Sequence, residues 1–270
     1  MKKFNIYPNA YYNYLKDRKS AYYSRKNIMK KFIYETYHKH HGVDGYRTMH
    51  AYMNRNGHKI SRLTVHKYMN KELKLYSITR RRRPSYESGK HHKVFDNKLN
   101  QEFFSSEINR KWCTDFTYLF LTDGSKRYNC TIIDLHDRSV IASITDRHIT
   151  SDLAKRTLKK AIESQKGINL SKLMLHSDQG SQFTSKDFTE YCEGLGITQS
   201  MSKAGYPYDN APMERYFNTL KNNLIYHHYY HTQEELYKAI EEFAYVEYNH
   251  SRPHSYNNYK TPFEARYGAI

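Results

Sequence analysis

Cysteine and long apolar runs are both scarce in this chain of 270 residues. The three cysteines, Cys113, Cys130 and Cys192, are too few and too scattered for a disulfide framework, and no Cys-x-x-Cys pair offers a zinc or redox site. No stretch approaches the ~20 apolar residues of a membrane span, and no apolar run follows the basic start Met1-Lys2-Lys3, as a signal peptide would require. We therefore exclude a disulfide-stapled secreted domain and a membrane protein, and we expect a cytoplasmic one.

Acidic residues are also in short supply, with 27 Asp and Glu against 44 Lys and Arg, which gives a net charge of +17 and a pI near 9.5. The basic excess is interpreted as spread along the whole chain rather than confined to a tail. Such a spread favours a nucleic-acid partner over a basic protein that charge merely keeps soluble. The few acids that occur in distinctive contexts are then candidates for metal binding.

Residues 1–79 have the sequence pattern of a small helical region. A mixed apolar and basic helix is expected over residues 21–37. A second helix, with Met49 and Met53 at helical spacing, is expected to stop at Asn56-Gly57.

A third helix is expected from residue 62 to residue 73, because Ser61 is placed to cap it. Leu63, Tyr68 and Met69 are the candidates for its buried side. Two short helices joined by a turn in a basic context predict a helix-turn-helix, whose second helix contacts DNA near its start. The expected DNA contacts are Arg62, Thr64, His66 and Lys67.

A basic segment, residues 80–105, separates this region from the rest of the chain and has the composition of a linker. Its arginines either lie along the phosphate backbone of DNA or form a solvated tether, and the residues alone favour neither interpretation. The arginines in question form one run: Arg80, Arg81, Arg82 and Arg83.

From residue 106 to residue 270 the pattern changes to strands and helices of an α/β core. Three strands come first, joined by hairpins such as the one at Asp123-Gly124, and crossover helices follow. Ser151, Asp209 and Thr232 are expected to cap three of the helices, Thr232 within a capping box. The expected strands are residues 112–121, 127–133, 140–145, 172–175 and 197–201, and the expected helices are residues 151–167, 186–195, 209 onward and 232–248.

Three acids of this region occur in distinctive contexts. Asp115 lies in a strand among apolar residues, where a carboxylate is unfavourable unless it is paired or bound to a metal. Asp178 follows an apolar strand, at the end where α/β sheets place reactive groups, and Glu214 falls in the first turns of a helix that Pro212 can start. Carboxylates from two strands and a helix can converge and hold two Mg²⁺ ions about 3.5–4 Å apart, an arrangement suited to phosphodiesters.

Lys221 supports the same interpretation. It lies seven residues after Glu214, almost two turns at about 3.6 residues per turn, so both side chains should point the same way. A cation beside the acids suits a DNA phosphate near the metal ions.

These contexts resemble the DDE transposases of bacterial insertion sequences, and most closely the second-reading-frame protein (OrfB) of the IS-three family. Upstream, Gly45-Tyr46-Arg47 and the helix pair after it resemble the family's small helix-turn-helix. The motifs that carry the resemblance in residues 111–267 are Trp112-Cys113-Thr114-Asp115, His176-Ser177-Asp178-Gln179-Gly180-Ser181-Gln182-Phe183, Asp209-Asn210-Ala211 with Glu214, Thr219-Leu220-Lys221, Tyr248-Asn249-His250-Ser251-Arg252-Pro253-His254 and Tyr259-Lys260-Thr261-Pro262.

The resemblance implies an RNase H-like α/β core of the retroviral-integrase type, with a mixed five-stranded sheet and flanking helices, preceded by a small all-α helix-turn-helix domain. We accordingly expect a DNA-binding region at residues 1–79, a basic linker at 80–105 and a catalytic core at 106–270. The triad of Asp115, Asp178 and Glu214 is then expected to bind two Mg²⁺ ions, for which Mn²⁺ can substitute. The expected DNA contacts of the core are Lys221, Asn210 and Arg215.

The implied activity is transposition, with metal-dependent strand cleavage at the ends of the insertion sequence followed by strand transfer. The implied partners are double-stranded DNA, as terminal inverted repeats and as target, further copies of the chain on that DNA, and the upstream-frame protein OrfA, either fused to the chain or acting in trans. We expect the protein to be associated with the nucleoid.

Other classes of protein fit less well. A zinc module like that of retroviral integrases is not expected, because the N-terminal histidines lack cysteine partners. A tyrosine recombinase would form a covalent bond to DNA, but Arg252 and His254, which faintly suggest one, fit the transposase tail better. The remaining alternative is an inactive relic that only binds DNA or regulates, and metal-dependent cleavage distinguishes it from an enzyme.

Overall fold

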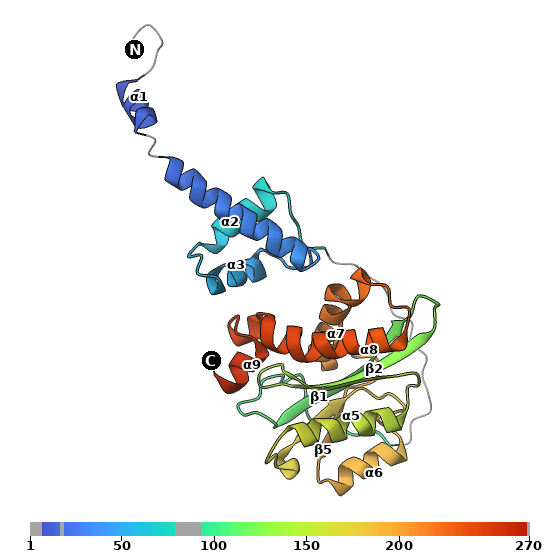
Figure 1. The fold of residues 1–270 in the computed structure, drawn as a ribbon. Helices are drawn as coiled ribbons and strands as arrows, with labels where there is room; N and C mark the ends of the chain where they lie inside the picture. The colour runs from blue at the N-terminus through green and yellow to red at the C-terminus, as the bar shows by residue number, and fades with distance from the viewer. Residues whose placement is uncertain (1–6, 17–18, 79–92, 269–270) are drawn as a thin grey trace. The chain divides into compact units, whose positions relative to one another are not determined.

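Residues 7–16, 19–78 and 93–268 are described by the computed structural model of the chain, which divides after residue 79 into two units. Figure 1 shows helices alone in the first unit and a sheet flanked by helices in the second. The predicted functional division at residues 79 and 105 stays a prediction. The predicted DNA-binding residues Arg80, Arg81, Arg82 and Arg83 lie outside the described residues.

The described part of the first unit consists of short and medium helices. The helix predicted over residues 62–73 is two segments in series, an α-helix that continues as a π-helix. The earliest helix was not predicted, because none of its residues is buried and it therefore has no apolar face to detect. The elements are α1 (Pro8–Leu15), α2 (Ser20–Lys39), α3 (Tyr46–Arg55), α4 (Arg62–His66) and the π-helix η2 (Lys67–Glu72).

A core of its own holds the first unit together. Ser61 caps α4 as predicted, since its hydroxyl accepts a hydrogen bond from the Thr64 N–H at 3.2 Å. The prediction that Leu63 is buried is wrong, because this side chain is 80% exposed. Val65 is buried instead, and it lies on the same helix face as the buried residues Tyr68 and Met69, three and four positions later. The core side chains are Met29, Ile33, Tyr37, Met49, Met53, Val65, Tyr68 and Met69.

The second unit contains all the strands of the described chain. The strands are β1 (Lys111–Phe120), β2 (Lys126–Asp134), β3 (Val140–Asp146), β4 (Met174–Ser177) and β5 (Thr198–Met201). The α-helices are α5 (Ser151–Ser164), α6 (Lys186–Gly194), α7 (Ala211–Asn223), α8 (Gln233–Glu242) and α9 (Pro262–Tyr267). Shorter or wider helical turns are η3 (Leu170–Lys172), η4 (Pro207–Asn210), η5 (Ile225–His227), the π-helix η6 (Phe243–Ser251) and η7 (Ser255–Asn257).

The five strands form one mixed sheet in the order β3-β2-β1-β4-β5. The first three strands pair antiparallel through hairpins, whereas β4 runs parallel to β1 and β5 parallel to β4. Parallel neighbours need crossover connections, which α5 and α6 supply. This order and mixture of directions are those of the RNase H-like fold, so the predicted fold class is confirmed.

Helices cover both faces of the sheet, with α5 and α6 on one side and α7 and α8 on the other (Figure 1). Side chains alternate along β1, so Trp112 packs with α5 and α6 while Cys113 packs with α7. Asp115 lies two residues beyond Cys113 and therefore projects from the α7 face. The core packing thus already determines which side of the sheet can hold a site that includes this acid.

The edge strand β3 is sealed by side chains of η6. The Asn249 amide accepts a hydrogen bond from the Val140 N–H and donates one to the Val140 carbonyl, both at 2.9 Å. The Tyr245 hydroxyl accepts from the Ser143 N–H at 2.8 Å. Free backbone groups on an edge strand invite pairing with other chains, so these contacts give the C-terminal motif a structural role.

Some predicted helix ends are wrong. Thr150 rather than Ser151 caps α5 with its hydroxyl. Asp209 does not cap α7; the N-cap is Asn210, which makes no capping bond with its side chain. The capping box at Thr232 is confirmed, but α8 changes into the π-helix η6 after 10 residues.

Residues 93–105, placed by the sequence in the linker, pack against the second unit. Leu99 is buried in the core beneath α7, and the Lys93 N–H donates to the Thr184 carbonyl at 3.0 Å. The backbone N–H groups of Lys98 and Leu99 both donate to the Ser200 hydroxyl, at 2.9 and 3.1 Å. This segment is therefore structurally part of the core unit.

Candidate active site

Asp115 and Asp178 become neighbours through the register between β1 and β4. The parallel pairing aligns Trp112 with Leu175 and ends with Cys113 aligned with His176. Both acids lie two residues beyond that last pair, Asp115 within β1 and Asp178 directly after β4, so the same register brings them near each other. They occupy the point where the paired part of β4 ends, the end at which α/β sheets carry their reactive groups.

The third acid, Glu214, is carried by α7 to the same face of the sheet. Pro212 falls in the first turn, where its missing N–H is not needed. A carboxylate in a first turn is also favoured by the helix dipole. The apolar side of the helix packs on the sheet, which leaves Glu214 exposed and Lys221 partly buried; that apolar side consists of Met213, Tyr216, Phe217 and Leu220.

The electrostatics of these groups show that they interact. Burial raises the pKa of Asp115 well above its usual value, and the charges of Asp178 and Glu214 raise it further. The Phe116 N–H, which donates to Asp115 Oδ1 at 2.7 Å, and the Lys221 ammonium act in the opposite direction on this pKa. Burial also raises the pKa of Glu214, and it lowers that of Lys221 against the attraction of Asp115. The structure therefore brings all three acids and the lysine into one electrostatic group.

The loop after β4 holds Asp178 with its own backbone. The Gly180 N–H donates to Asp178 Oδ1 at 2.9 Å. A Cβ atom on Gly180 would lie 2.9 Å from that same oxygen and 2.8 Å from Gln182 Oε1. Glycine is therefore needed for the backbone to approach the carboxylate this closely.

His176, two residues before Asp178, is buried in a defined protonation state. The Ser200 hydroxyl accepts two backbone hydrogen bonds, so its own proton is directed to His176 Nδ1, 2.9 Å away. The imidazole proton then lies on Nε2, which faces the Ser202 hydroxyl at 3.0 Å. Burial lowers the pKa of His176 to about 4, and the neutral ring joins β4 to β5 beneath the acids.

No three His, Cys, Asp or Glu side chains among the described residues are already grouped tightly enough to hold a metal ion. The kind of donor nevertheless fits a hard divalent cation, since all three side chains are carboxylates, and the charges of Asp178 and Glu214 add to the effect of burial in raising the pKa of Asp115. Glu214 is the most exposed of the three.

The N-terminal histidines are engaged one at a time. His40 Nδ1 lies 2.8 Å from Asp44 Oδ2, and His50 Nε2 lies 2.9 Å from the Ile60 carbonyl oxygen. These contacts fix the His40 and His50 rings within the helical unit.

The predicted DNA contacts of the first unit lie at the start of α4–η2. Arg62 and Lys67 are exposed there, while Thr64 and His66 are partly buried. The Thr64 hydroxyl lies 2.8 Å from the Ser61 hydroxyl, and the His66 ring packs edge-on against Tyr46 at 5.0 Å. Two of the four side chains therefore also have a structural contact.

The predicted DNA contacts of the core have different environments. Arg215 is exposed beside Glu214. Asn210 is only 5% exposed, and its amide donates to the Thr114 carbonyl at 3.2 Å. The structure thus gives Asn210 a contact inside the protein, next to Asp115.

Three further residues around the site were not identified from the sequence as functional. Asn97 and Gln101 donate to the carboxyl of Asp209, which the sequence suggested only as a helix cap. Asn97 and Gln101 lie 112 and 108 residues before Asp209 in the chain. No local pattern could have indicated them.

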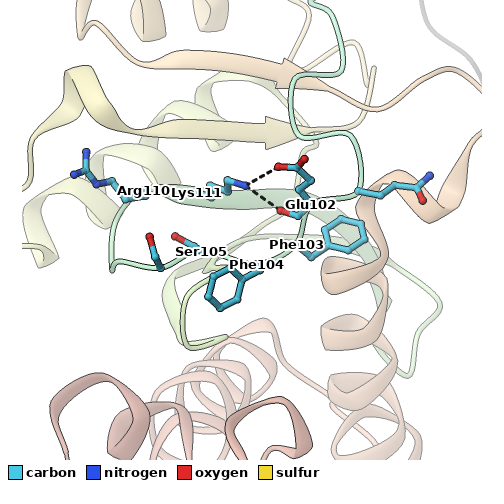
Figure 2. A pocket seen from close by; sticks show the side chains of 8 residues that line it. Glu102, Phe103, Phe104, Ser105, Arg110 and Lys111 are labelled. Carbon is cyan, nitrogen blue, oxygen red and sulfur yellow. Dashed lines mark hydrogen bonds and ion pairs between the residues drawn. The ribbon is translucent and has the colours of Figure 1, made fainter.

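A pocket of about 590 Å³ lies apart from the three acids and is lined by residues 101–106 with Arg110 and Lys111 (Figure 2). The Lys111 ammonium donates to the Glu102 carbonyl at 3.1 Å and lies 3.7 Å from the Glu102 carboxylate. None of the three acids lines this pocket. Its charged lining residues are Glu102, Arg110 and Lys111, of which Glu102 and Lys111 form an ion pair.

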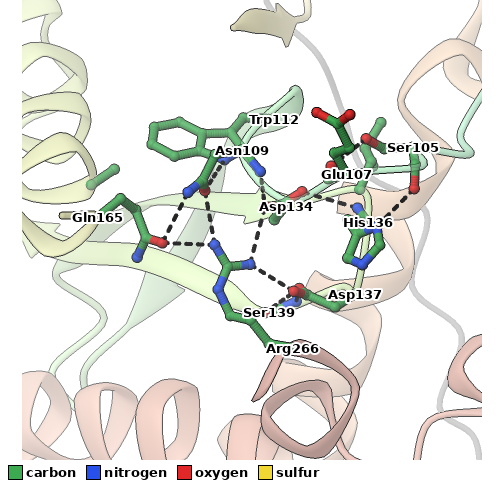
Figure 3. A network of polar contacts seen from close by, with 12 residues as sticks. Ser105, Glu107, Asn109, Trp112, Asp134, His136, Asp137, Ser139, Gln165 and Arg266 are labelled. Atoms are coloured by element: carbon green, nitrogen blue, oxygen red, sulfur yellow. Dashed lines mark hydrogen bonds and ion pairs between the residues drawn. The ribbon is translucent and has the colours of Figure 1, made fainter. Parts of the chain in front are cut away.

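A second charged cluster is buried around the Arg266 side chain (Figure 3). Arg266 lies 3.0 Å from Asp134 and 2.6 Å from Asp137, and its other terminal nitrogen donates to Asn109 and Gln165 at 2.8 and 2.6 Å. Exposed fractions of 3% for the Arg266 side chain and 0% for both acids exclude substrate access. This cluster anchors α9 and is structural.

Comparison with known proteins agrees with the geometry. Three family models match the chain. An HTH-like domain matches residues 24–83, and two models of the integrase core domain match residues 105–207 and 195–262. No helix of the described residues is long and apolar enough to cross a membrane.

Individual relatives cover most of the chain. InsK of insertion sequence element IS150 from Escherichia coli (strain K12) is 32% identical over 83% of this chain and 77% of that protein. The 31 kDa protein of insertion element IS600 from Shigella sonnei is 29% identical over 93% of this chain and 92% of that protein. Among solved structures, the HTLV-2 integrase catalytic core domain in complex with magnesium covers 59% of this chain and 97% of that chain, with 20% identity and a TM-score of 0.45.

An integrase core preceded by an HTH-like domain indicates a DNA-binding protein, and integrase-type cores typically use a divalent metal. The mixed sheet, the strand order and the identity to InsK over more than two thirds of its length lead to one assignment. The chain belongs to the DDE-type transposases of bacterial insertion sequences, polynucleotidyl transferases of DNA transposition and integration.

Proposed function

We propose that Asp115, Asp178 and Glu214 are the catalytic carboxylates of this transposase. The observation that carries the proposal is the β1–β4 register, which brings Asp115 and Asp178 to the face of the sheet on which the first turn of α7 lies. The pKa of Asp115, raised first by burial and then by the charges of Asp178 and Glu214, agrees with this placement. Asp115 lies within β1, Asp178 directly follows the parallel neighbour β4, and Glu214 lies in the first turn of α7. The Phe116 and Gly180 N–H groups orient the two aspartates.

The three carboxylates would hold two Mg²⁺ ions, for which Mn²⁺ can substitute. When bound, such ions stabilise the attacking and leaving oxygens of a phosphoryl transfer. The protein's part is to supply the negative charge and to hold both aspartates by backbone hydrogen bonds. The Glu214 side chain would move toward the two aspartates to complete the set of ligands. Mutual repulsion of the acids favours cation binding, because a cation relieves it.

The reaction consists of two transfers at phosphorus. In cleavage at an end of the element, a water oxygen bonds to phosphorus and the water gives up a proton. The bond from phosphorus to the 3′ oxygen breaks, and that oxygen gains a proton and becomes a 3′-hydroxyl. In strand transfer, this hydroxyl oxygen bonds to a phosphorus of the target, one phosphodiester bond of the target breaks, and the displaced oxygen gains the proton. One bond forms for each that breaks, so strand transfer needs no ATP.

Basic residues would hold the DNA on either side of this chemistry. Lys221, whose charge reaches Asp115, is placed to contact a phosphate next to the reacting bond. Arg215, exposed one residue after Glu214, is placed to contact a neighbouring phosphate. In the first unit, base and phosphate contacts would come from Arg62, Thr64, His66 and Lys67, and in the linker from Arg80, Arg81, Arg82 and Arg83.

The assembly would contain more than one chain. Joining two ends of an element requires two sets of DNA contacts, so we propose a homo-multimer on the terminal inverted repeats and the target. We further propose that OrfA, the upstream-frame protein, acts with this chain as a fusion or in trans. A DNA substrate of this kind places the complex at the nucleoid.

A cleavage and joining assay tests the proposal. Labelled duplexes that carry the DNA ends flanking the gene would be incubated with the full chain, with Mg²⁺, with Mn²⁺ or with EDTA. We expect metal-dependent products that Asp178→Asn abolishes. The matched control, Asp187→Asn, removes an exposed first-turn acid of α6 and should leave the products unchanged.

Two results would contradict the assignment. Products that persist in Asp178→Asn would place the chemistry elsewhere. DNA binding without any cleavage, in the presence of OrfA as well, would favour the alternative function of a DNA-binding relic or regulator.

A further inference from the structure

The carboxyl of Asp209 accepts three hydrogen bonds from two separate segments of the chain. Asn97 Nδ2 donates to its Oδ2 and Gln101 Nε2 to its Oδ1, each at 2.8 Å, and the Lys203 N–H donates to Oδ2 at 3.0 Å. Asp209 is only 3% exposed. Buried hydrogen bonds to an ionised carboxyl are the stronger kind, so this residue joins the segment before β1, the loop after β5 and the turn that leads into α7.

The next residue, Asn210, connects the same turn to β1. Its amide donates to the Thr114 carbonyl at 3.2 Å from a position that is 5% exposed. Thr114 immediately precedes Asp115, and Asn210 immediately precedes the first residue of α7. One side-chain amide therefore spans the shortest structural path between Asp115 and the first turn that holds Glu214.

We propose that Asp209 and Asn210 are positioning residues that fix the start of α7 and so set where Glu214 meets Asp115. The inference rests on the active site proposed above. It assigns Asn210 a role inside the protein rather than on DNA, and it gives Asn97 and Gln101 a supporting role through Asp209.

Physical reasons favour this role over simple stability. The apolar contacts of α7 involve Met213 and residues further along the helix, whereas Glu214 lies on the more exposed side of the first turn and is not part of that apolar cluster. A displacement of about 1 Å at a reacting group can reduce a rate about 100-fold. Groups that orient metal-binding carboxylates typically change metal affinity about 10- to 100-fold when they are removed.

Two near-isosteric substitutions in the full chain test the inference. Asp209→Asn removes the negative charge and places an NH₂ group against one of its three donors. Asn210→Asp removes the donor to the Thr114 carbonyl. The matched control is Asn249→Asp, which removes the same kind of bond, from a side-chain amide to a strand carbonyl, between η6 and Val140 on the edge strand β3.

Three measurements separate positioning from stability: the melting temperature, amide hydrogen exchange of residues 211–217 without metal, and the Mn²⁺ dissociation constant by calorimetry. We expect Asp209→Asn and Asn210→Asp each to raise the Mn²⁺ dissociation constant about tenfold. Exchange at residues 211–217 should become faster in both, since the first turn of α7 opens more often. Asn249→Asp should lower the melting temperature and leave the other two quantities at their wild-type values.

The outcomes also distinguish failure of the inference from failure of the proposed function. One outcome overturns the positioning role while the active site stands. In it, the wild type and both test variants bind Mn²⁺ with the same affinity, and Asp115→Asn does not bind it. If the wild type and Asp115→Asn bind Mn²⁺ equally, the proposed site fails, and unchanged exchange at residues 211–217 would overturn positioning separately. Should either test variant unfold, Asn97→Ala and Gln101→Ala each remove one donor: faster exchange at residues 211–217 supports the role and wild-type exchange refutes it.

Discussion

At the scale of single residues, Gly180 is required by what it touches and not by its backbone conformation. Its φ is not positive, so an alanine fits the backbone, but the new Cβ would lie 2.9 Å from Asp178 Oδ1 and 2.8 Å from Gln182 Oε1. Both atoms end flexible side chains and can move aside. We expect Gly180→Ala to keep its melting temperature and to lose cleavage activity about 10- to 100-fold, because the carboxylate is displaced.

Gly194→Ala is the matched control for this prediction. A Cβ at Gly194, the last residue of α6, meets no atom within 4 Å. Cleavage rates and melting curves of the two variants decide the question. Equal activity in Gly180→Ala and Gly194→Ala would show that the approach of residue 180 to Asp178 has no catalytic importance.

His254 gives a prediction on pH. Burial lowers its pKa to about 4, and the charges of Arg138, Arg252 and Arg215 add to the effect. At pH values between about 4, the pKa of His254 in the folded chain, and about 6.5, its ordinary pKa, His254 binds a proton in the unfolded chain but not in the folded chain. This contribution to stability is present above about pH 6.5 and is lost as the pH falls toward 4.

The size of the effect is at most about 3 kcal/mol at the acid end. His254→Gln should therefore show a shallower fall in the free energy of unfolding between pH 6.5 and 4.5 than the wild type. Urea unfolding at several pH values measures this slope, and any constant loss from the altered contact with the Tyr256 N–H cancels. Parallel curves for the two proteins would contradict the prediction.

The same scale shows which site residues a sequence can identify. Asp115, Asp178 and Glu214 each lie in a short motif with a local cause, and the structure brings them together. Asp209 lies in a motif as well, yet its role comes from Asn97 and Gln101, more than 100 residues away. A side chain whose partners are set by tertiary folding gives no local signal, so its function was predicted incorrectly as a helix cap.

At the scale of elements, α9 has only 6 residues and depends on one buried ion cluster. Arg266 is paired there with Asp134 and Asp137 (Figure 3). Its removal would leave two carboxylates buried without a counter-charge, and breaking a buried pair typically costs about 3–5 kcal/mol. We expect Arg266→Met to lose that much unfolding free energy in denaturant titration.

Arg156→Met is the comparison for this prediction. Arg156 also pairs with two aspartates, Asp146 and Asp152, but its side chain is 45% exposed. Solvent screens such a pair, so its loss should cost about 0–1 kcal/mol. Similar losses for Arg156→Met and Arg266→Met would mean that burial does not control the strength of these ion pairs.

Helix ends illustrate what is predictable about elements. The N-cap at Ser61 and the capping box at Thr232 were predicted because a single suitable side chain precedes each helix. At α5, Thr150 and Ser151 are adjacent hydroxyl residues, and the choice falls on Thr150 because its backbone is extended, with φ −135° and ψ 160°. That backbone conformation follows from how the chain leaves β3, which local sequence does not encode.

At the scale of the whole molecule, the positive charge is less evenly spread than the sequence analysis assumed. Residues 1–79 contain 17 Lys and Arg against 4 Asp and Glu, a net +13 of the total +17, which leaves +4 for residues 80–270. The earlier interpretation of an even spread is therefore wrong. The helical first unit carries most of the positive charge that attracts a polyanion, whereas the second unit is more nearly balanced, with 23 Asp and Glu against 27 Lys and Arg.

This asymmetry predicts where the salt dependence of DNA binding originates. Each phosphate contact contributes about 0.9 to the slope of log affinity against log salt concentration. The double variant Arg62→Gln with Lys67→Gln should therefore lower the magnitude of the slope by about 1.8. The double variant Lys159→Gln with Lys186→Gln removes the same charge from exposed helix positions of the second unit, 68% and 67% exposed, and should leave the slope unchanged.

Fluorescence anisotropy with a labelled end duplex at several salt concentrations measures both slopes. Equal changes in the two variants would mean that total charge, and not contact by α4–η2, sets the affinity, because a long-range field does not distinguish where a lysine is removed.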